Sequence, residues 1–275
     1  MRTAAFLVVA SLASLAGAAE TDPRCKGFHS LLSPLPDACL EVIDTDRPHQ
    51  TDTPHVAPAG HSQFESAVAA VPLGGTLGAP EGQRDAHVVL LDTIYKFGLF
   101  SRSDLQLAFK HLDYVPGTQR FAPPGPVSLR MKFNIVEEHK ALPAITLVPW
   151  GFFPMSPSQT LRGGGYVFWG WELGKHFEVE MNAGVLLSAQ RSQPQAADYH
   201  PKPLAVVVLA TALTYTIVGN FRIFVDIYAT GYDIALGTGA LWAFTRDMQI
   251  DAGTYIGING DEPVATPFLG FSLRR

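Results

Sequence analysis

Charged side chains recur at every second position within apolar stretches of this sequence. In the stretch VSLRMKFNIV, Arg130 and Lys132 alternate with Leu129, Met131 and Phe133. Charges arranged in this way can order water and select among polar solutes where they line a narrow passage. The candidate lining residues are Lys96, Lys110, Arg130, Lys132, Glu172, Glu178, Glu180, Arg222, Asp226 and Asp251.

The sign of these charges changes along the chain. The earlier candidates are mainly basic, with Asp92 among them, and the later ones are mainly acidic, with Arg222 among them. Because neighbouring strands of an up-and-down barrel follow chain order, cations and anions would gather on opposite walls. Two interpretations stay open: a transverse field that filters polar solutes, or salt-bridged pairs that close the lumen.

The histidines give little support to a catalytic or metal site. His111 and His176 lie near expected strand ends, but no serine stands in an obvious partnership with them and no G-x-S-x-G elbow occurs. His49, His55 and His61 recur every six residues in a Pro-rich segment, where this spacing fixes no metal geometry. We therefore expect no enzymatic activity, no metal and no cofactor.

The elements that would position the lining residues are β-strands, because polar and apolar residues alternate with a period of two from His61 onward. The 25 Gly and 21 Pro residues fit many short strands joined by turns. Even the apolar run from Leu204 to Gly219 is shorter than a membrane-spanning helix and rich in β-branched residues. About twelve strands are expected, at residues 61–72, 86–98, 103–113, 126–136, 143–152, 164–173, 176–188, 204–217, 221–230, 234–244, 247–258 and 265–274.

Alternating antiparallel strands fit either a secreted soluble fold with an apolar core or a membrane barrel whose apolar face contacts lipid. Residues 1–19 have the pattern of a cleaved secretory signal peptide, and long polar connections alternate with tight turns. Both features favour the membrane barrel. Aromatic residues near strand ends would suit the two membrane interfaces: Trp150, Phe152, Phe153, Trp169, Trp171, Trp242 and Phe244.

Composition limits the partners and the redox environment. Only 16% of the residues are charged, the formal net charge is -5, and no Lys/Arg-rich run occurs, so nucleic acid is not an expected partner. Export to an oxidising compartment would allow a disulfide between Cys25 and Cys39, with two free thiols as the alternative.

The segment TDRPHQTDTPHVAPAGHSQFE, residues 45–65, resembles an N-terminal pattern of a family of bacterial outer-membrane β-barrel transporters associated with meta-pathway phenol degradation. The stretch from Met248 onward resembles the closing hairpin of the same family. His49 departs from the family's usual Asp, and Arg274 and Arg275 stand where such strands usually end in Phe or Trp. The matching residues are Thr45, Asp46, Arg47, Pro48, Thr51, Asp52, Pro54, Pro58, Gly60, Gln63, Glu65, Asp251, Gly253, Gly257, Asn259 and Gly270.

The resemblance implies an all-β fold, a transmembrane antiparallel up-and-down β-barrel of about twelve strands in the bacterial outer membrane. We expect a signal peptide at residues 1–19, a periplasmic or lumenal segment at residues 20–60, and the barrel at residues 61–275. The lumen of such a barrel is too wide for its own side chains to fill.

The Pro-rich segment is the candidate to occupy this space, because its prolines cannot join a β-ladder. It would fold inward as a partial plug through Asp46, Arg47 and Asp52, or else remain a solvated periplasmic tail. The expected function is passive or facilitated passage of small solutes, for which the resemblance suggests hydrophobic or aromatic compounds. The alternative is a non-conducting structural or adhesion barrel. Expected partners are outer-membrane lipid, a small-molecule solute and the barrel assembly machinery.

Overall fold

The structure is a computed structural model of the 275-residue chain. It describes residues 23–48, 50–71, 73–76, 88–115, 120–122, 126–139, 141–155, 161–188, 205–231, 233–259 and 263–275. The expected signal peptide therefore lies outside the described residues.

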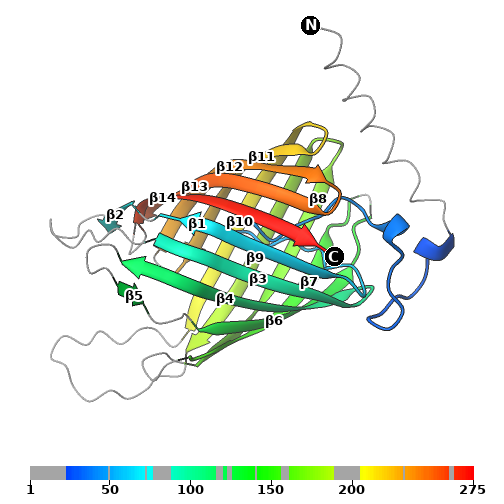
Figure 1. Ribbon diagram of the computed structural model, residues 1–275, viewed down its shortest axis with the longest axis horizontal. Coiled ribbons are helices and arrows are strands. Elements are labelled where there is room, and N and C mark those ends of the chain that lie inside the picture. The colour runs from blue at the N-terminus through cyan, green and yellow to red at the C-terminus, as the bar shows by residue number, and fades with distance from the viewer. Residues whose placement is uncertain are drawn as a thin grey trace, which may run out of the picture.

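The described chain is almost entirely β-structure (Figure 1). Two short 3-10 helices, η2 (Pro23–Cys25) and η3 (Asp37–Cys39), precede the strands. The strands are β1 (Ser62–Ala70), β2 (Leu73–Thr76), β3 (Val88–Phe100), β4 (Ser103–Val115), β5 (Arg120–Ala122), β6 (Val127–Val136), β7 (Ala144–Phe153), β8 (Arg162–Leu173), β9 (Phe177–Ser188), β10 (Ala205–Val218), β11 (Phe221–Thr230), β12 (Asp233–Thr245), β13 (Met248–Asn259) and β14 (Pro263–Arg274).

Twelve of these strands form a closed antiparallel barrel, which confirms the expected fold class. Each barrel strand pairs with its neighbour in chain order, and β1 pairs with β14 to close the ring. The short strands β2 and β5 extend this sheet by pairing with β14 and β4. Closure leaves the barrel without free strand edges, as a β-structure in lipid requires.

The two faces of the barrel wall differ in polarity. On β11, Ile223 and Val225 are 41% and 48% exposed on the outside, whereas Phe224 and Asp226 are 3% and 2% exposed and point inward. The pattern repeats around the barrel, so the exterior is an apolar belt and the interior carries the polar side chains. This is the arrangement of a transmembrane barrel. In the part of the chain that the structure describes, no helix is both long and apolar enough to cross a membrane.

Tight turns and long connections lie at opposite ends of the barrel (Figure 1). Two-residue turns join β10 to β11 and β12 to β13, and in the first of them Gly219 has a φ of +55°, a conformation that glycine adopts without steric cost. The C-terminus and both 3-10 helices lie at this short-turn end. In outer-membrane barrels the short turns face the periplasm.

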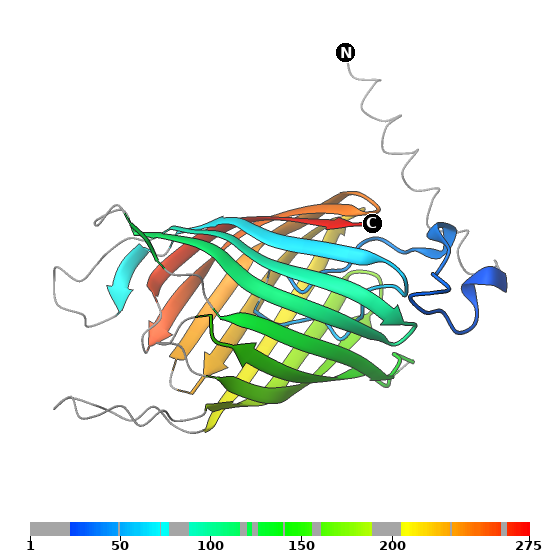
Figure 2. The ribbon, with the colours of Figure 1, turned by 60° about the horizontal axis from the view of Figure 1, so that its bottom comes forward.

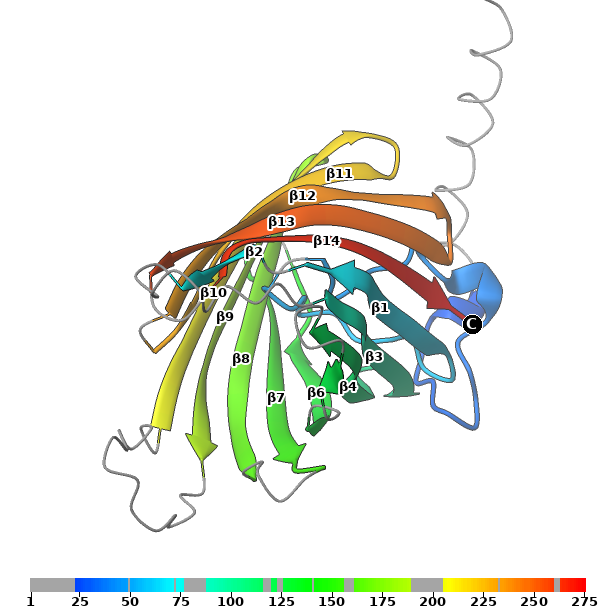
Figure 3. The ribbon, with the colours of Figure 1, turned by 60° about the vertical axis from the view of Figure 1, so that its left-hand side comes forward.

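The chain before β1 has two parts, which we call the N-terminal lobe (residues 23–43) and the inner segment (residues 44–59). A disulfide between Cys25 and Cys39 closes the lobe at the short-turn end of the barrel. The inner segment then runs inside the barrel before the chain leaves to form β1 (Figures 2 and 3).

Part of the expected aromatic girdle is wrong. Trp150 and Phe152 pair across the sheet with Arg130 and Ser128, and the indole Nε1 of Trp150 donates to the Ser128 Oγ at 2.5 Å. These two rings therefore share the inward face. Trp242 and Phe244, by contrast, are exposed on the outside of β12 near the short turns.

Candidate functional site

The inner segment is buried although it contains no regular structure. Thr45, Asp46, Thr51 and Thr53 are each no more than 3% exposed. A segment without a β-ladder must find other partners for its backbone and polar side chains when it is enclosed. Inward-facing side chains of the strands supply them.

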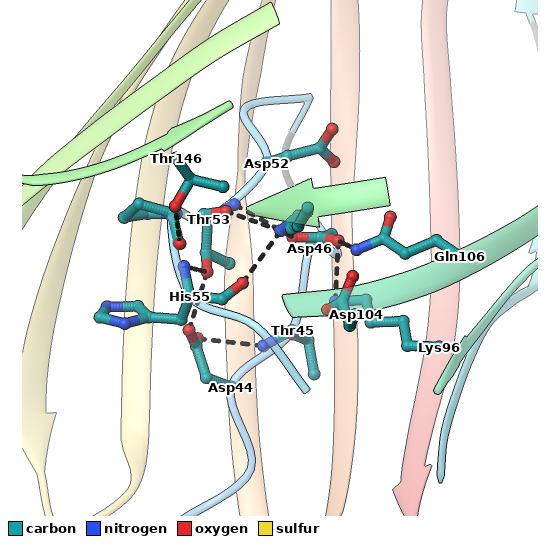
Figure 4. A network of polar contacts seen from close by, with 12 residues as sticks. Asp44, Thr45, Asp46, Asp52, Thr53, His55, Lys96, Asp104, Gln106 and Thr146 are labelled. Carbon is teal, nitrogen blue, oxygen red and sulfur yellow. Dashed lines mark hydrogen bonds and ion pairs between the residues drawn. The ribbon is translucent and has the colours of Figure 1, made fainter. Parts of the chain in front are cut away.

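Asp46 is the centre of the resulting network (Figure 4). Its carboxylate accepts from the ammonium groups of Lys132 at 2.5 Å and Lys96 at 2.8 Å, and from the Gln106 amide at 3.1 Å. Lys96 also forms an ion pair with Glu65 on β1. Four elements, the inner segment, β3, β4 and β6, thus meet at one carboxylate, and β1 joins them through Glu65.

Lys132 binds the inner segment by its backbone as well. Its ammonium group donates to the carbonyl oxygens of Thr53 at 2.7 Å and His55 at 3.2 Å. The ring of Phe168 lies 5.4 Å from the same nitrogen. Lys132 is fully buried, so these partners replace the water that an ammonium group would otherwise bind.

Carboxylates on β11, β13 and β1 bind other parts of the inner segment. The Arg47 guanidinium lies 3.6 Å from the Asp251 carboxylate on β13, and the Arg47 backbone N–H donates to Glu65 at 3.0 Å. The Gln50 backbone N–H donates to Asp226 on β11 at 2.7 Å. The chain is therefore bonded across the lumen rather than to one wall.

Two further carboxylates fix the second half of the inner segment. Asp52 forms an ion pair with Arg130 on β6 at 2.7 Å. Asp104 on β4 accepts from the Ala57 backbone N–H at 2.8 Å. One of these carboxylates thus belongs to the segment and binds the wall, and the other belongs to the wall and binds the segment.

Gly98 provides the closest approach between the inner segment and the wall. A Cβ atom at this position would lie 2.0 Å from the Pro58 carbonyl oxygen, far inside van der Waals contact. Ala59 and Gly98 form a parallel β-bridge at the same place. Only glycine allows the segment to lie directly against β3 here.

Electrostatics favours the ionised form of Asp46. Burial alone would raise the pKa of this carboxyl, but Lys132 and Lys96 lower the pKa below its ordinary value. Asp52 differs, because burial raises its pKa and Arg130 only partly offsets that rise. Asp46 is consequently a fixed negative charge of the segment.

The ten sequence-predicted lining residues have different surroundings. Lys96, Arg130 and Lys132 contact the acidic inner segment, and Asp226 and Asp251 contact its other side. Glu180 is 2% exposed on β9, and Glu178 lies 3.4 Å from Arg222. Glu172 is exposed at the end of β8. The Lys110 side chain lies outside the described residues.

Most of the predicted basic and acidic lining residues occupy different parts of the wall, although Glu65 on β1 and Asp104 on β4 bring two carboxylates to the basic part. The basic residues Lys96, Arg130 and Lys132 lie on β3 and β6. The predicted acidic residues lie on β9, β11 and β13, with Glu172 at the end of β8, and Arg222 lies among them. The sequence left open a transverse field or salt-bridged pairs between the two groups. In the structure, the inner segment lies between the basic and the acidic group and binds both.

Several polar residues of the site were not predicted as lining or plug residues. Gln106 binds Asp46, and Thr146 donates to the Pro54 carbonyl oxygen. Arg274 contacts Asp247 at 2.7 Å and the Glu41 carbonyl oxygen at 2.5 Å, so the unusual basic C-terminus holds the N-terminal lobe. The signal for most of them was present, since polar residues at every second position of a strand share its inward face: Gln63, Glu65, Asp104, Gln106, Thr146 and Gln249.

A cavity of about 210 Å³ opens at the short-turn end beside this network. Its lining includes Glu172, His176, Glu178 and Arg222. Among the described residues, no group of three or more His, Cys, Asp and Glu side chains has the arrangement of a metal site. The cavity is therefore a polar recess of the mouth.

Comparison with known families gives one match that covers most of the chain. Residues 45–274 match the family described as "Putative MetA-pathway of phenol degradation". No curated protein sequence matches the chain.

Solved structures support the architecture. An outer membrane channel from Pseudomonas putida superposes with a TM-score of 0.58 at 10% identity, over 78% of this chain and 94% of that one. The KdgM porin superposes with a TM-score of 0.46 at 8% identity, over 78% of this chain and 98% of that one. The P. putida toluene transporter TodX superposes with a TM-score of 0.32 at 7% identity, over 78% of this chain and 87% of that one. The first similarity supports the barrel fold, and the two weaker ones carry no further conclusion.

Proposed function

We propose that the barrel is a channel of the bacterial outer membrane for small solutes. The premise is that the chain belongs to the family described as "Putative MetA-pathway of phenol degradation". The observation that carries the proposal is the difference in polarity between the outer and inner faces of the barrel wall. Apolar side chains such as Val225 face outward, and acidic ones such as Asp226 face an enclosed interior. A barrel with these faces is stable in a bilayer and offers polar solutes a route through it.

The inner segment acts as a plug of this channel. Asp46, Arg47 and Asp52 hold it through Lys132, Asp251 and Arg130. These contacts are polar and non-repetitive, so the segment can leave the wall without breaking the pairing between barrel strands. A solute passes when the plug is displaced or rearranged.

The solute class follows from the family and from the inward rings. Trp150 and Tyr166 lie 5.1 Å apart on neighbouring strands, and Tyr166 and Phe168 lie 5.8 Å apart. A wall of closely packed aromatic rings favours flat or apolar solutes over strongly hydrated ones. Small hydrophobic or aromatic compounds are therefore the proposed cargo.

A channel, rather than an enzyme, is the class that family and fold support. The proposed partners are outer-membrane lipid, a small solute and, during insertion, the barrel assembly machinery.

Solute uptake by proteoliposomes tests the function. We expect vesicles with the purified protein to take up small aromatic solutes faster than protein-free vesicles and faster than they take up a large polysaccharide. The second candidate, a non-conducting structural barrel, is favoured by the completeness of the ion pairs around Asp46. It predicts no uptake even after the inner segment is removed.

A further inference from the structure

The N-terminal lobe spans the mouth of the barrel from one group of strands to another. Its first contacts are with the β3–β4 turn, where the Leu31 N–H donates to the Leu99 carbonyl oxygen at 2.9 Å. Its last contacts are with the β12–β13 turn, where the Ile43 N–H donates to the Arg246 carbonyl oxygen at 2.7 Å. The Cys25–Cys39 disulfide closes the loop that contains Leu31 and ends four residues before Ile43.

The two sides of the lobe differ in polarity. Toward β12–β13, Arg246 donates to the Asp37 carbonyl oxygen at 2.7 Å and Arg274 donates to that of Glu41. Toward β3–β4, three large apolar side chains remain uncovered: Phe28 is 74% exposed, Leu31 55% and Leu32 95%. Contiguous exposed apolar groups of this size mark an interaction surface.

This apolar surface continues the lipid-facing belt of the barrel. The Phe28 ring stacks on Phe100 at 5.8 Å, and Ser30 forms a β-bridge with Phe100. Phe97 and Phe133, on the outside of β3 and β6, are each 40% exposed at the same end. The three lobe residues thus lie at the edge of a surface that already faces acyl chains.

We propose that Phe28, Leu31 and Leu32 insert into the phospholipid leaflet next to the short turns and anchor the N-terminal lobe beside the barrel. Apolar side chains at a polar–apolar boundary enter the headgroup and acyl-chain region, while the polar side of the element stays in water. The inference rests on the proposed membrane location. It adds a role for the lobe, because an anchored lobe fixes the start of the inner segment at the mouth.

Photocrosslinking to lipid tests the anchor. A diazirine-bearing residue replaces Leu32 in the full chain, which is reconstituted in phosphatidylcholine vesicles, irradiated and examined for lipid adducts by mass spectrometry. Val225, on the outside of β11, is the positive control, and Ala38, an exposed residue of η3 on the polar side of the lobe, is the matched negative control. We expect an adduct yield at Leu32 close to that at Val225 and well above that at Ala38.

The outcomes separate the anchor from the channel. Adducts at Val225 with no more at Leu32 than at Ala38 would overturn the anchor and leave the channel intact, as would crosslinks from Leu32 to a second protein chain. Absence of adducts at all three positions would contradict the membrane location itself. Heat-modifiable migration in gel electrophoresis verifies that each variant is a folded barrel, and a replacement at Phe28 repeats the test at a second position.

Discussion

Asp46 and Lys132 form a buried ion pair, 2.5 Å between carboxylate and ammonium, that joins the inner segment to strand β6. Neither residue is accessible to water, and Lys96 adds a second ammonium at 2.8 Å. The pair therefore joins the inner segment to the wall at a site shielded from water.

Replacing Asp46 with Asn should release the inner segment. The substitution leaves the buried Lys132 ammonium without its counter-charge and Lys96 with Glu65 alone, and loss of one partner of a buried ion pair typically costs about 3–5 kcal/mol. We expect a lower midpoint of urea unfolding and a larger fraction of time in open states in single-channel recordings.

The matched control for Asp46 is the ion pair between Arg102 and Glu137, which has the same kind of groups at 2.8 Å but lies on the surface, with side chains 55% and 65% exposed. Glu137→Gln should change stability by no more than about 1 kcal/mol. Equal effects of the two substitutions would argue that Asp46 does not hold the segment.

Gly98→Ala should displace the inner segment by steric conflict alone. The added methyl group would meet the carbonyl oxygens of Pro58 and Ala57, which belong to the segment and its junction with β1, and no atom of the strands lies as close. Gly165→Ala on β8 is the control, since its nearest neighbour would be 3.8 Å away. Protease cleavage within the inner segment should rise for Gly98→Ala and stay unchanged for Gly165→Ala.

Val225→Arg tests the outward face. Valine 225 lies near the middle of β11, where an arginine against lipid costs about 2–4 kcal/mol. Val218→Arg, at the end of β10 next to the short turn, should cost only about 0–1 kcal/mol because the guanidinium reaches the interface. An equal loss of unfolding free energy in vesicles for Val225→Arg and Val218→Arg would contradict the assigned position of the bilayer.

Reduction of the Cys25–Cys39 disulfide should loosen the lobe without unfolding the barrel. The closed loop has a sequence separation of 14, for which chain entropy gives a stabilisation of about 3 kcal/mol. Trypsin cleavage after Lys26 should therefore become faster in reducing buffer, while the unfolding midpoint of the barrel stays the same. A fall of that midpoint would mean that the lobe and barrel unfold together.

The strands could be predicted from the sequence because their signal is local. Alternation placed the strand at 221–230 at the bounds of β11, and the barrel strands were all expected within a few residues. The inward position of Lys132 and Asp226 followed from the same alternation.

The contacts of the site could not be predicted in the same way. Asp46 and Lys132 are separated by 86 residues, and their pairing depends on the path of a segment with no repeating pattern. Trp150 was misplaced because an aromatic ring near a strand end suits either face. Trp150 lies opposite Arg130 and therefore shares its inward face, and that register appears only in the folded sheet.

Single-channel conductance in planar bilayers tests the central claim most directly, with the full chain compared to a chain that lacks residues 45–60. We expect small or intermittent currents from the full chain and a larger, steadier current from the deletion, because the lumen then loses its occupant. Absence of current from both proteins, with the barrel shown to be folded, would contradict the assignment of this protein as a channel.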